Sequence, residues 1–148
     1  MAGESDYPYL NLLFRLSLDG EPMVDFAECS GLSMGILTEE YAEGGENRFT
    51  HRFPTRGEPV NLVMKRGMTR TRELWEWFQA YLDTGVVQPR DGQVELYDTP
   101  DQDAAPVRVW AFTSAFPVTW TGPDLNALSP AVAFETLELV HRGIRLAE

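Results

Sequence analysis

The chain has 148 residues and a net charge of −11, and 43% of its residues are hydrophobic while 24% are charged. This length and composition predict one globular domain with a real hydrophobic core. The strong acidity argues against specific recognition of nucleic acid and against membrane binding by the chain itself, because both require a basic surface.

The first residues and the cysteine content bear on the compartment. The opening MAGESDYPYL has neither the basic region nor the apolar run of a secretory signal. No apolar run approaches the roughly 20 residues that span a bilayer. The single cysteine, Cys29, excludes an internal disulfide and suits a reducing environment. These features predict a protein that is made and assembled in the cytoplasm.

The charge is distributed unevenly along the chain. Residues 1–50 carry a net charge of −8, residues 51–90 carry +3, and residues 91–148 carry −6. A basic middle between acidic flanks is compatible with self-association through complementary patches. A solvated surface tuned for solubility is the simpler explanation of the charge alone.

The first third of the chain reads as antiparallel strands. Alternate apolar residues over 10–18 predict a half-buried strand, and Asp19-Gly20 predicts a tight hairpin turn after it. The return strand is expected over 23–29, and a further strand over 33–41. From 42 to 59 the pattern dissolves into AEGGENRFTHRFPTRGEP, which predicts an extended loop of a length that is uncommon inside compact domains. Aromatic residues in this loop suggest that it becomes ordered against another surface.

A short strand over 60–64 precedes the one convincing helix, TRELWEWFQAYLDTG. Thr69 or Thr71 is a candidate N-cap, and Gly85 is placed to end the helix. One face of the helix gathers large apolar side chains, which predicts core packing on a sheet. These are Leu74, Trp75, Trp77, Phe78, Tyr81 and Leu82.

Later strands are predicted over 93–97, 107–112, 115–120 and 131–141. Pro117 confines its strand to an edge or a bulge. The last strand carries apolar residues on both faces, which is typical of a central strand or of one covered by a partner. The sum is seven or eight strands and one helix. It predicts a mainly β fold, a sandwich or barrel with a flanking α-helix.

The inventory of catalytic side chains is thin. His51 and His141 lie far apart in sequence, and no group of residues has the spacing of a metal site. Cys29 is best read as a small buried residue, although a cysteine–histidine pair formed in space stays open. The segment GGEN at 44–47 lacks the lysine and the context of a phosphate loop. No cofactor or metal is therefore expected.

The acidic and basic residues suggest structural roles. Asp124 follows Gly122-Pro123 and fits a turn, while Glu135 and Glu138 fall on opposite faces of the last strand. The remaining charges fit a solvated edge or salt bridges within or between copies: Glu39, Glu40 and Glu43, and Lys65, Arg66, Arg70 and Arg72. Two alternatives remain: a sugar-binding module with Trp110 and Trp120 as its platform, and a hydrolase that uses Asp124 with a second acid.

Five segments, in order along the chain, resemble the phage tail tube protein family of contractile tails and extracellular contractile injection systems. They are SGLS at 30–33, EEYAEGGEN at 39–47, MKRGMTRTRELWEW at 64–77, VTWTGPDLNA at 118–127 and ETLELVHRG at 135–143. The resemblance runs from about residue 7 to residue 143. It implies two packed antiparallel β-sheets with one helix, as in Hcp of the type VI secretion system.

The resemblance also implies a structural subunit without an active site. Six copies would form a ring, and rings would stack into a hollow tube inside a sheath, with cargo passing through the lumen. The implied partners are other copies, the sheath protein, the baseplate or initiator and the tube terminator. Whether the chain forms the tube body or an initiator ring stays open. The residues expected at subunit interfaces are Glu43, Gly44, Gly45, Arg48, Phe49, Phe53, Arg56, Trp120, Pro123, Asp124 and Asn126.

Overall fold

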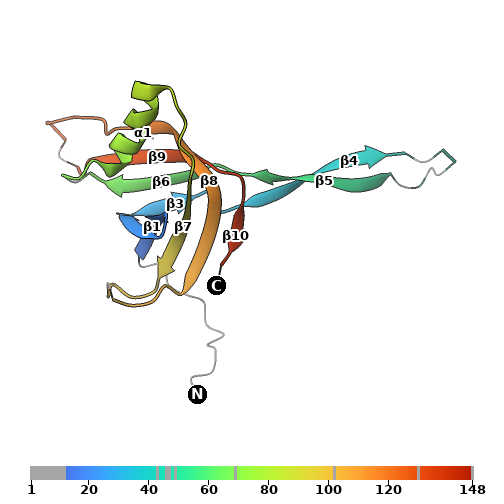
Figure 1. Cartoon of the computed structure of the whole chain (residues 1–148), viewed down its shortest axis with the longest axis horizontal. Helices are drawn as coiled ribbons and strands as arrows, with labels where there is room; N and C mark the ends of the chain where they lie inside the picture. The colour runs from blue at the N-terminus through green and yellow to red at the C-terminus, as the bar shows by residue number, and fades with distance from the viewer. Residues whose placement is uncertain are drawn as a thin grey trace, which may run out of the picture.

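The structure is a computed structural model that describes residues 13–42, 44–45, 48, 50–68, 70–101, 103–129 and 131–147. Within these residues the chain forms ten strands and one helix (Figure 1). They are β1 (Leu13–Leu18), β2 (Glu21–Phe26), β3 (Glu28–Ser30), β4 (Met34–Tyr41), β5 (His51–Pro59), β6 (Leu62–Gly67), α1 (Glu73–Thr84), β7 (Arg90–Tyr97), β8 (Arg108–Thr121), β9 (Phe134–Val140) and β10 (Ile144–Leu146).

The main sheet is antiparallel and curls back on itself. Its strand order is β2-β1-β7-β8-β9-β6-β3, with β10 paired to β8. Only Ala27 separates β2 from β3, and its amide donates a hydrogen bond to the carbonyl oxygen of Lys65 at 2.9 Å. The two ends of the sheet are therefore consecutive in the chain. The result is the predicted mainly β architecture of two packed antiparallel sheets with one helix.

The curled main sheet forms two packed layers. One contains β2, β1, β7 and β10, and the other contains β9, β6 and β3. Strand β8 belongs to both layers. Its first half pairs with β7 and its second half with β9. Between the two halves, Ser114 has a positive φ of 51°, and the register with β9 shifts between Pro117 and Thr119. The sequence predicts an edge or a bulge at Pro117, and the structure shows a bulge. The prediction of two separate strands over 107–120 is wrong, because the chain turns the corner without leaving the sheet.

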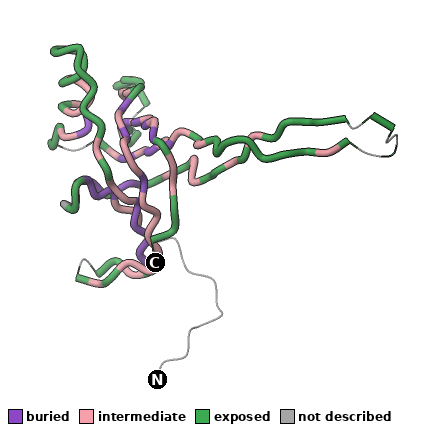
Figure 2. The backbone as a smooth tube through the Cα atoms, turned by 45° about the vertical axis from the view of Figure 1, so that its right-hand side comes forward, coloured by how far each residue is buried: buried purple, intermediate pink, exposed green. Residues whose placement is uncertain are grey.

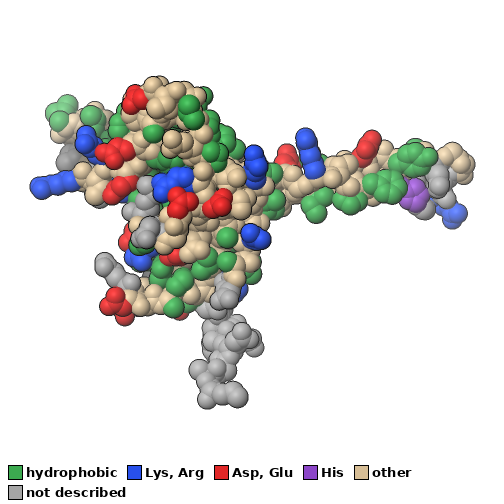
Figure 3. Space-filling view, viewed as in Figure 1, with side chains coloured by type: hydrophobic (Ala, Val, Ile, Leu, Met, Phe, Trp, Pro, Cys, Tyr) green, Lys and Arg blue, Asp and Glu red, His purple; other side chains and the backbone are tan. Residues whose placement is uncertain are grey.

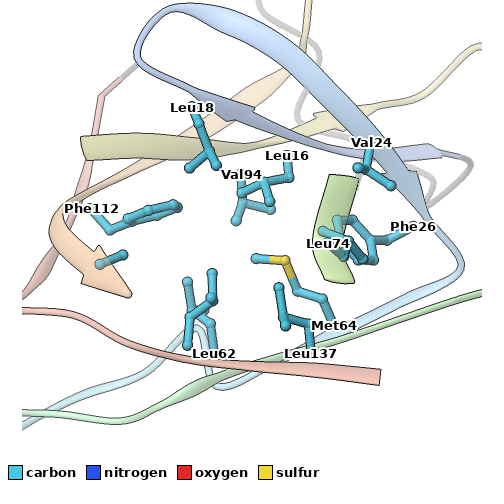
Figure 4. Close-up of a cluster of buried hydrophobic side chains, with 12 residues drawn as sticks. Leu16, Leu18, Val24, Phe26, Leu62, Met64, Leu74, Val94, Phe112 and Leu137 are labelled. Atoms are coloured by element: carbon cyan, nitrogen blue, oxygen red, sulfur yellow. The ribbon is translucent and has the colours of Figure 1, made fainter. Parts of the chain in front are cut away.

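The core lies between the two sheets (Figure 4). Alternate residues of β1 and β7 meet alternate residues of β6 and β9, as the period of two requires. Leu16, Leu62, Leu137 and Leu139 have no exposed surface. The strand β9 lies between β6 and β8, which confirms the central position that its two apolar faces predict. The β1–β2 turn at Asp19 and Gly20 also has the predicted left-handed conformation, with φ of 52° and 83°.

Helix α1 packs over β8, but it buries less than its sequence predicts. Only Leu74 is fully buried, whereas Tyr81 and Leu82 are 43% and 55% exposed. The C-terminal half of the aromatic face is therefore not core. Gly85 ends the helix with φ 67°, as predicted. The N-cap is Arg72, whose side chain makes no capping bond, so the choice of Thr71 is wrong; Thr69 lies outside the described residues.

The extended loop predicted over 42–59 is in large part a strand. β4 and β5 form a two-stranded hairpin, here called the arm, that projects from the barrel (Figure 1). The sequence hides β5 because its side chains are mostly polar and exposed on both faces. Cross-strand hydrogen bonding, rather than burial, holds this strand in place. Figure 2 shows the arm as exposed along most of its length.

Candidate interaction surfaces

The outer part of the arm carries several of the predicted interface residues. Phe53 is 53% exposed, and its ring centroid lies 6.3 Å from that of Tyr41 and 6.4 Å from that of His51. Gly44, Gly45, Arg48 and Arg56 belong to the arm and are exposed; Glu43 and Phe49 lie outside the described residues. The ring of Phe53 contacts the other two rings in the outer part of the arm, and the barrel does not shield them from solvent.

The arm contains a β-bulge near its base. The register pairs Ile36 with Gly57 and Leu37 with Arg56, and then shifts by one residue. Thr55 is the extra residue, and its hydroxyl donates to the carbonyl oxygen of Leu37 at 2.9 Å. Ile36 is 68% exposed. An ion pair between Arg52 and Glu40 at 3.1 Å crosses the outer part of the arm, so Glu40 has a partner there.

The loop that follows β8, residues 122–133, is the second surface. Pro123, Asp124 and Asn126 lie in it, as the sequence predicts. The Asn126 carboxamide oxygen accepts the amide of Leu128 at 3.0 Å, and its carbonyl oxygen accepts the amide of Ser129 at 3.3 Å. Leu125 and Leu128 are 86% and 95% exposed. The sequence analysis missed these leucines, although their place in a loop without strand or helix periodicity is a usable signal.

These two surfaces lie at opposite ends of the molecule. In Figures 1 and 3 the arm extends to the right, and the loop over 122–133 lies at the upper left, where hydrophobic side chains gather. The structure therefore does not bring the predicted interface residues into one site. It places them where one copy could reach two different neighbours.

A third apolar surface lies between α1 and β8. It is a hollow of about 280 Å³ lined by α1, by the residues that follow it and by the middle of β8. Its lining includes Trp77, Phe78, Tyr81, Val86, Phe116 and Val118 and contains no charged residue.

Trp120 has partners within its own chain. Its indole N–H donates to Glu135 Oε2 at 3.0 Å, and its ring meets the edge of Trp75 with centroids 4.8 Å apart. Glu135 also binds the buried Arg66. Trp110 and Trp120 both pack against the core from different halves of β8. The exposed aromatic platform of a sugar-binding module is thus not formed by this pair.

Two of the remaining candidate catalytic side chains, Cys29 and His141, are shielded from solvent to a large extent. Burial raises the pKa of the Cys29 thiol from 9.0 to about 11, which keeps it protonated and poorly nucleophilic at neutral pH. His141 is buried, and its Nε2 lies 2.7 Å from the carbonyl oxygen of Val60. Among the described residues, no group of three or more histidine, cysteine or acidic side chains could hold a metal ion. The described part of the chain also contains no helix with the length and hydrophobicity needed to cross a membrane.

The described residues thus form a barrel body with a projecting arm and with apolar surfaces that they leave uncovered, an arrangement that suits a structural protein. The chain belongs to the family of the T4-like virus tail tube protein gp19, whose model matches residues 10–145. No protein of curated function matches the sequence.

Solved structures agree with this family. A chain of the sheath–tube complex of PVC, an extracellular contractile injection system, in its extended state is 25% identical, with a TM-score of 0.81 over 95% of this chain and 92% of that chain. A chain of the anti-feeding prophage baseplate is 27% identical, with a TM-score of 0.78 over 96% and 97%. Hcp1 from Flavobacterium johnsoniae is 20% identical, with a TM-score of 0.53 over 92% and 95%, and shares the fold.

Proposed function

We propose that this chain is the repeating subunit of the inner tube of a contractile injection system or phage tail. Six copies form a ring, rings stack into a hollow tube, and cargo or DNA passes through its lumen. The observation that carries this proposal is the β4–β5 arm, which exposes Ile36, Tyr41 and Phe53 to solvent. In a family of tube proteins, another copy is the partner that such an arm fits.

The proposed partners follow from the same family. The tube subunit meets the sheath along its outer surface and meets the baseplate and the terminator at the tube ends. Assembly takes place in the cytoplasm, and the particle is released afterwards. A second candidate is an initiator ring that joins tube to baseplate. It is favoured by the match to a chain of the anti-feeding prophage baseplate, which covers 96% of this chain.

Electron microscopy of the purified protein, with light scattering beside it, tests the class. We expect six-fold rings or hollow tubes. Long tubes favour the tube subunit, whereas rings that do not stack favour the initiator. A chain that stays monomeric at high concentration and in the presence of tube fragments would contradict both candidates.

Removing the arm should leave the barrel folded, because β4 and β5 pair with each other and not with the main sheet. Leu37 and Arg56 pair across the hairpin, so an Asn-Gly turn can replace residues 38–55. We expect this variant to keep its near-ultraviolet circular dichroism and to lose tube formation. Glu58→Ser, a polar change in the retained base of the arm, is the control and should leave tubes intact. Tubes built from the shortened chain would show that the arm is not an assembly contact.

A further inference from the structure

Two apolar surfaces are left uncovered by the described residues of the chain. The leucine knob consists of Leu125, Leu128 and Val132, which are 86%, 95% and 68% exposed. The helix groove is the hollow between α1 and β8, with Tyr81, Leu82, Val86 and Val118 among its lining residues. Exposed apolar patches of this kind mark interaction sites. Leu128 in the knob is almost fully exposed, whereas the helix groove is a hollow.

The knob is held in a defined shape. Asn126 bonds the amide of Leu128 through its side chain and the amide of Ser129 through its carbonyl oxygen, at 3.0 Å and 3.3 Å. A turn fixed in this way presents Leu128 outward without help from a partner. Such preorganisation lowers the entropy cost of binding. The loop therefore has the properties of a docking element rather than of a mere linker.

The groove has room for aliphatic side chains and none for a charge. An apolar cavity of about 150 Å³ admits benzene, and the helix groove has a volume of about 280 Å³. Its lining residues are aromatic, aliphatic or uncharged polar. A charged group buried there would lose its hydration without gaining a partner. The occupant must therefore present apolar side chains on a segment that carries little charge.

The loop over 122–133 meets this requirement better than the arm does. Its one charged residue is Asp124, which lies before the knob. The arm intersperses its apolar residues with charges, among them Glu40 and Arg52, which pair at 3.1 Å. Docking the arm would bring these charges to the mouth of an uncharged hollow. The loop can place its leucine side chains in the groove without bringing a charged side chain along with them.

The groove and the knob belong to different parts of one copy. The groove is lined by residues up to Val118, whereas residues 124–133 border a separate hollow of about 290 Å³. We propose that the leucine knob of one copy inserts into the helix groove of a second copy. This inference rests on the proposed self-assembly and names one of its contacts. Because the two surfaces differ, the contact is heterologous, and each copy can bind two others through it.

Cysteine cross-linking tests the contact. In a Cys29→Ala background, Leu128→Cys and Val87→Cys place one thiol on the knob and one in the groove of the same chain. Both positions are exposed, so the changes should leave the fold intact. Mild oxidation should give a ladder of covalent oligomers on a non-reducing gel. Either single-cysteine chain can form dimers at most.

A matched chain addresses the competing occupant. Ile36→Cys with Val87→Cys, in the same background, reports whether the arm enters the groove instead. We expect no ladder from this pair. A ladder from Ile36 and Val87 only, or a ladder from neither pair, would overturn the inference. Leu128→Asp without added cysteines should abolish the association, and Leu128→Ala should weaken it about tenfold.

Microscopy of the same samples separates this inference from the proposed function. Tubes without a knob–groove ladder would overturn the contact and leave the tube subunit standing. A ladder in protein that never forms rings or tubes would support the contact and contradict the proposed function. Both readings come from the same full-length chain.

Discussion

Glu135 places a negative charge in the interior of the barrel, where the buried Arg66 balances it. Its second oxygen accepts the Trp120 indole N–H, so both carboxylate oxygens have partners. The second terminal nitrogen of Arg66 lies 3.9 Å from Glu73 at the start of α1. One buried cluster thus ties β6, β8 and β9 together beside the helix.

Removing the charge of Glu135 should leave the buried Arg66 without its principal negative counter-charge. We expect Glu135→Gln to lower the free energy of unfolding by about 3 kcal/mol, because breaking one side of a buried ion pair is costly. Urea denaturation measures the loss. Glu138→Gln is the matched control, since Glu138 faces the other side of β9 and accepts a bond from Asn61 at 2.9 Å that glutamine can retain. Equal losses in the two variants would show that the buried ion pair of Glu135 stabilises the fold no more than the hydrogen bond of Glu138 does.

The ionisation of the Cys29 thiol should make the free energy of unfolding depend on pH in the alkaline range. Burial raises the pKa of its thiol from 9.0 to about 11, so the folded chain holds the proton more tightly than the unfolded chain. The resulting stability is fully present below pH 9 and is lost as the pH rises toward 11. Over this window, we expect the free energy of unfolding to fall more steeply in the wild type than in Cys29→Ala. Parallel pH profiles would show that the thiol is not buried in solution.

The alternation of residues along the last strand is enough to place Glu135 and Glu138 on opposite faces, because the strand period is local. The partners of Glu135 are not local. Arg66 and Trp120 come from strands that are neighbours of β9 only once the sheet has formed. The sequence therefore predicts the faces of these side chains and not the buried cluster that they make.

Helix α1 ends where the sequence predicts, because Gly85 adopts the left-handed conformation. With φ at 67°, its amide donates to the carbonyl oxygen of Tyr81 at 2.7 Å. Gly85→Ala should lower the free energy of unfolding by about 1 kcal/mol, since a Cβ strains this conformation. Thermal denaturation measures the shift. Gly44→Ala, at a glycine without positive φ or close neighbours, is the control and should be nearly neutral.

The strands that the sequence misjudged share one physical cause. Strand β5 is exposed, so no burial imposes an apolar alternation on it. Strand β8 contains Ser114 at positive φ and a bulge at Pro117, features that look like an interruption in sequence. Strand β10 has three residues, too few for any period. Pairing with a neighbour defines all three strands, and pairing leaves little trace in a single sequence.

At the scale of the whole molecule, five segments in order were enough to recognise the tail tube family and its two-sheet fold. They did not locate the surfaces by which copies meet. Leu125 and Leu128 went unnoticed in the sequence, and the structure shows both of them exposed. The aromatic face of α1 reads as fully buried, and the structure leaves half of it as a groove. Exposure of this kind depends on packing between distant elements.

The net charge of −11 sets two explanations of self-association against each other. If uncharged contacts such as the knob and groove dominate, subunits of like charge repel, and added salt should speed assembly by screening that repulsion. If the basic segment over 51–90 meets acidic flanks of its neighbours, salt should slow assembly instead. We expect added salt to speed assembly. Light scattering can follow tube growth as sodium chloride is raised from about 20 mM to about 150 mM, at which the Debye length is about 8 Å.

Chloride suits this test because sulfate and phosphate also strengthen apolar burial and would imitate the expected effect. The Leu128→Asp variant supplies the control, since it should show no growth at any salt concentration if the knob is required. Slower growth of the wild type with added salt would assign the main contacts to ion pairs between copies. The basic middle of the chain, with Lys65, Arg66, Arg70 and Arg72, would then become the first place to look, beginning with Arg70 and Arg72 because Arg66 is already committed to Glu135 within its own barrel.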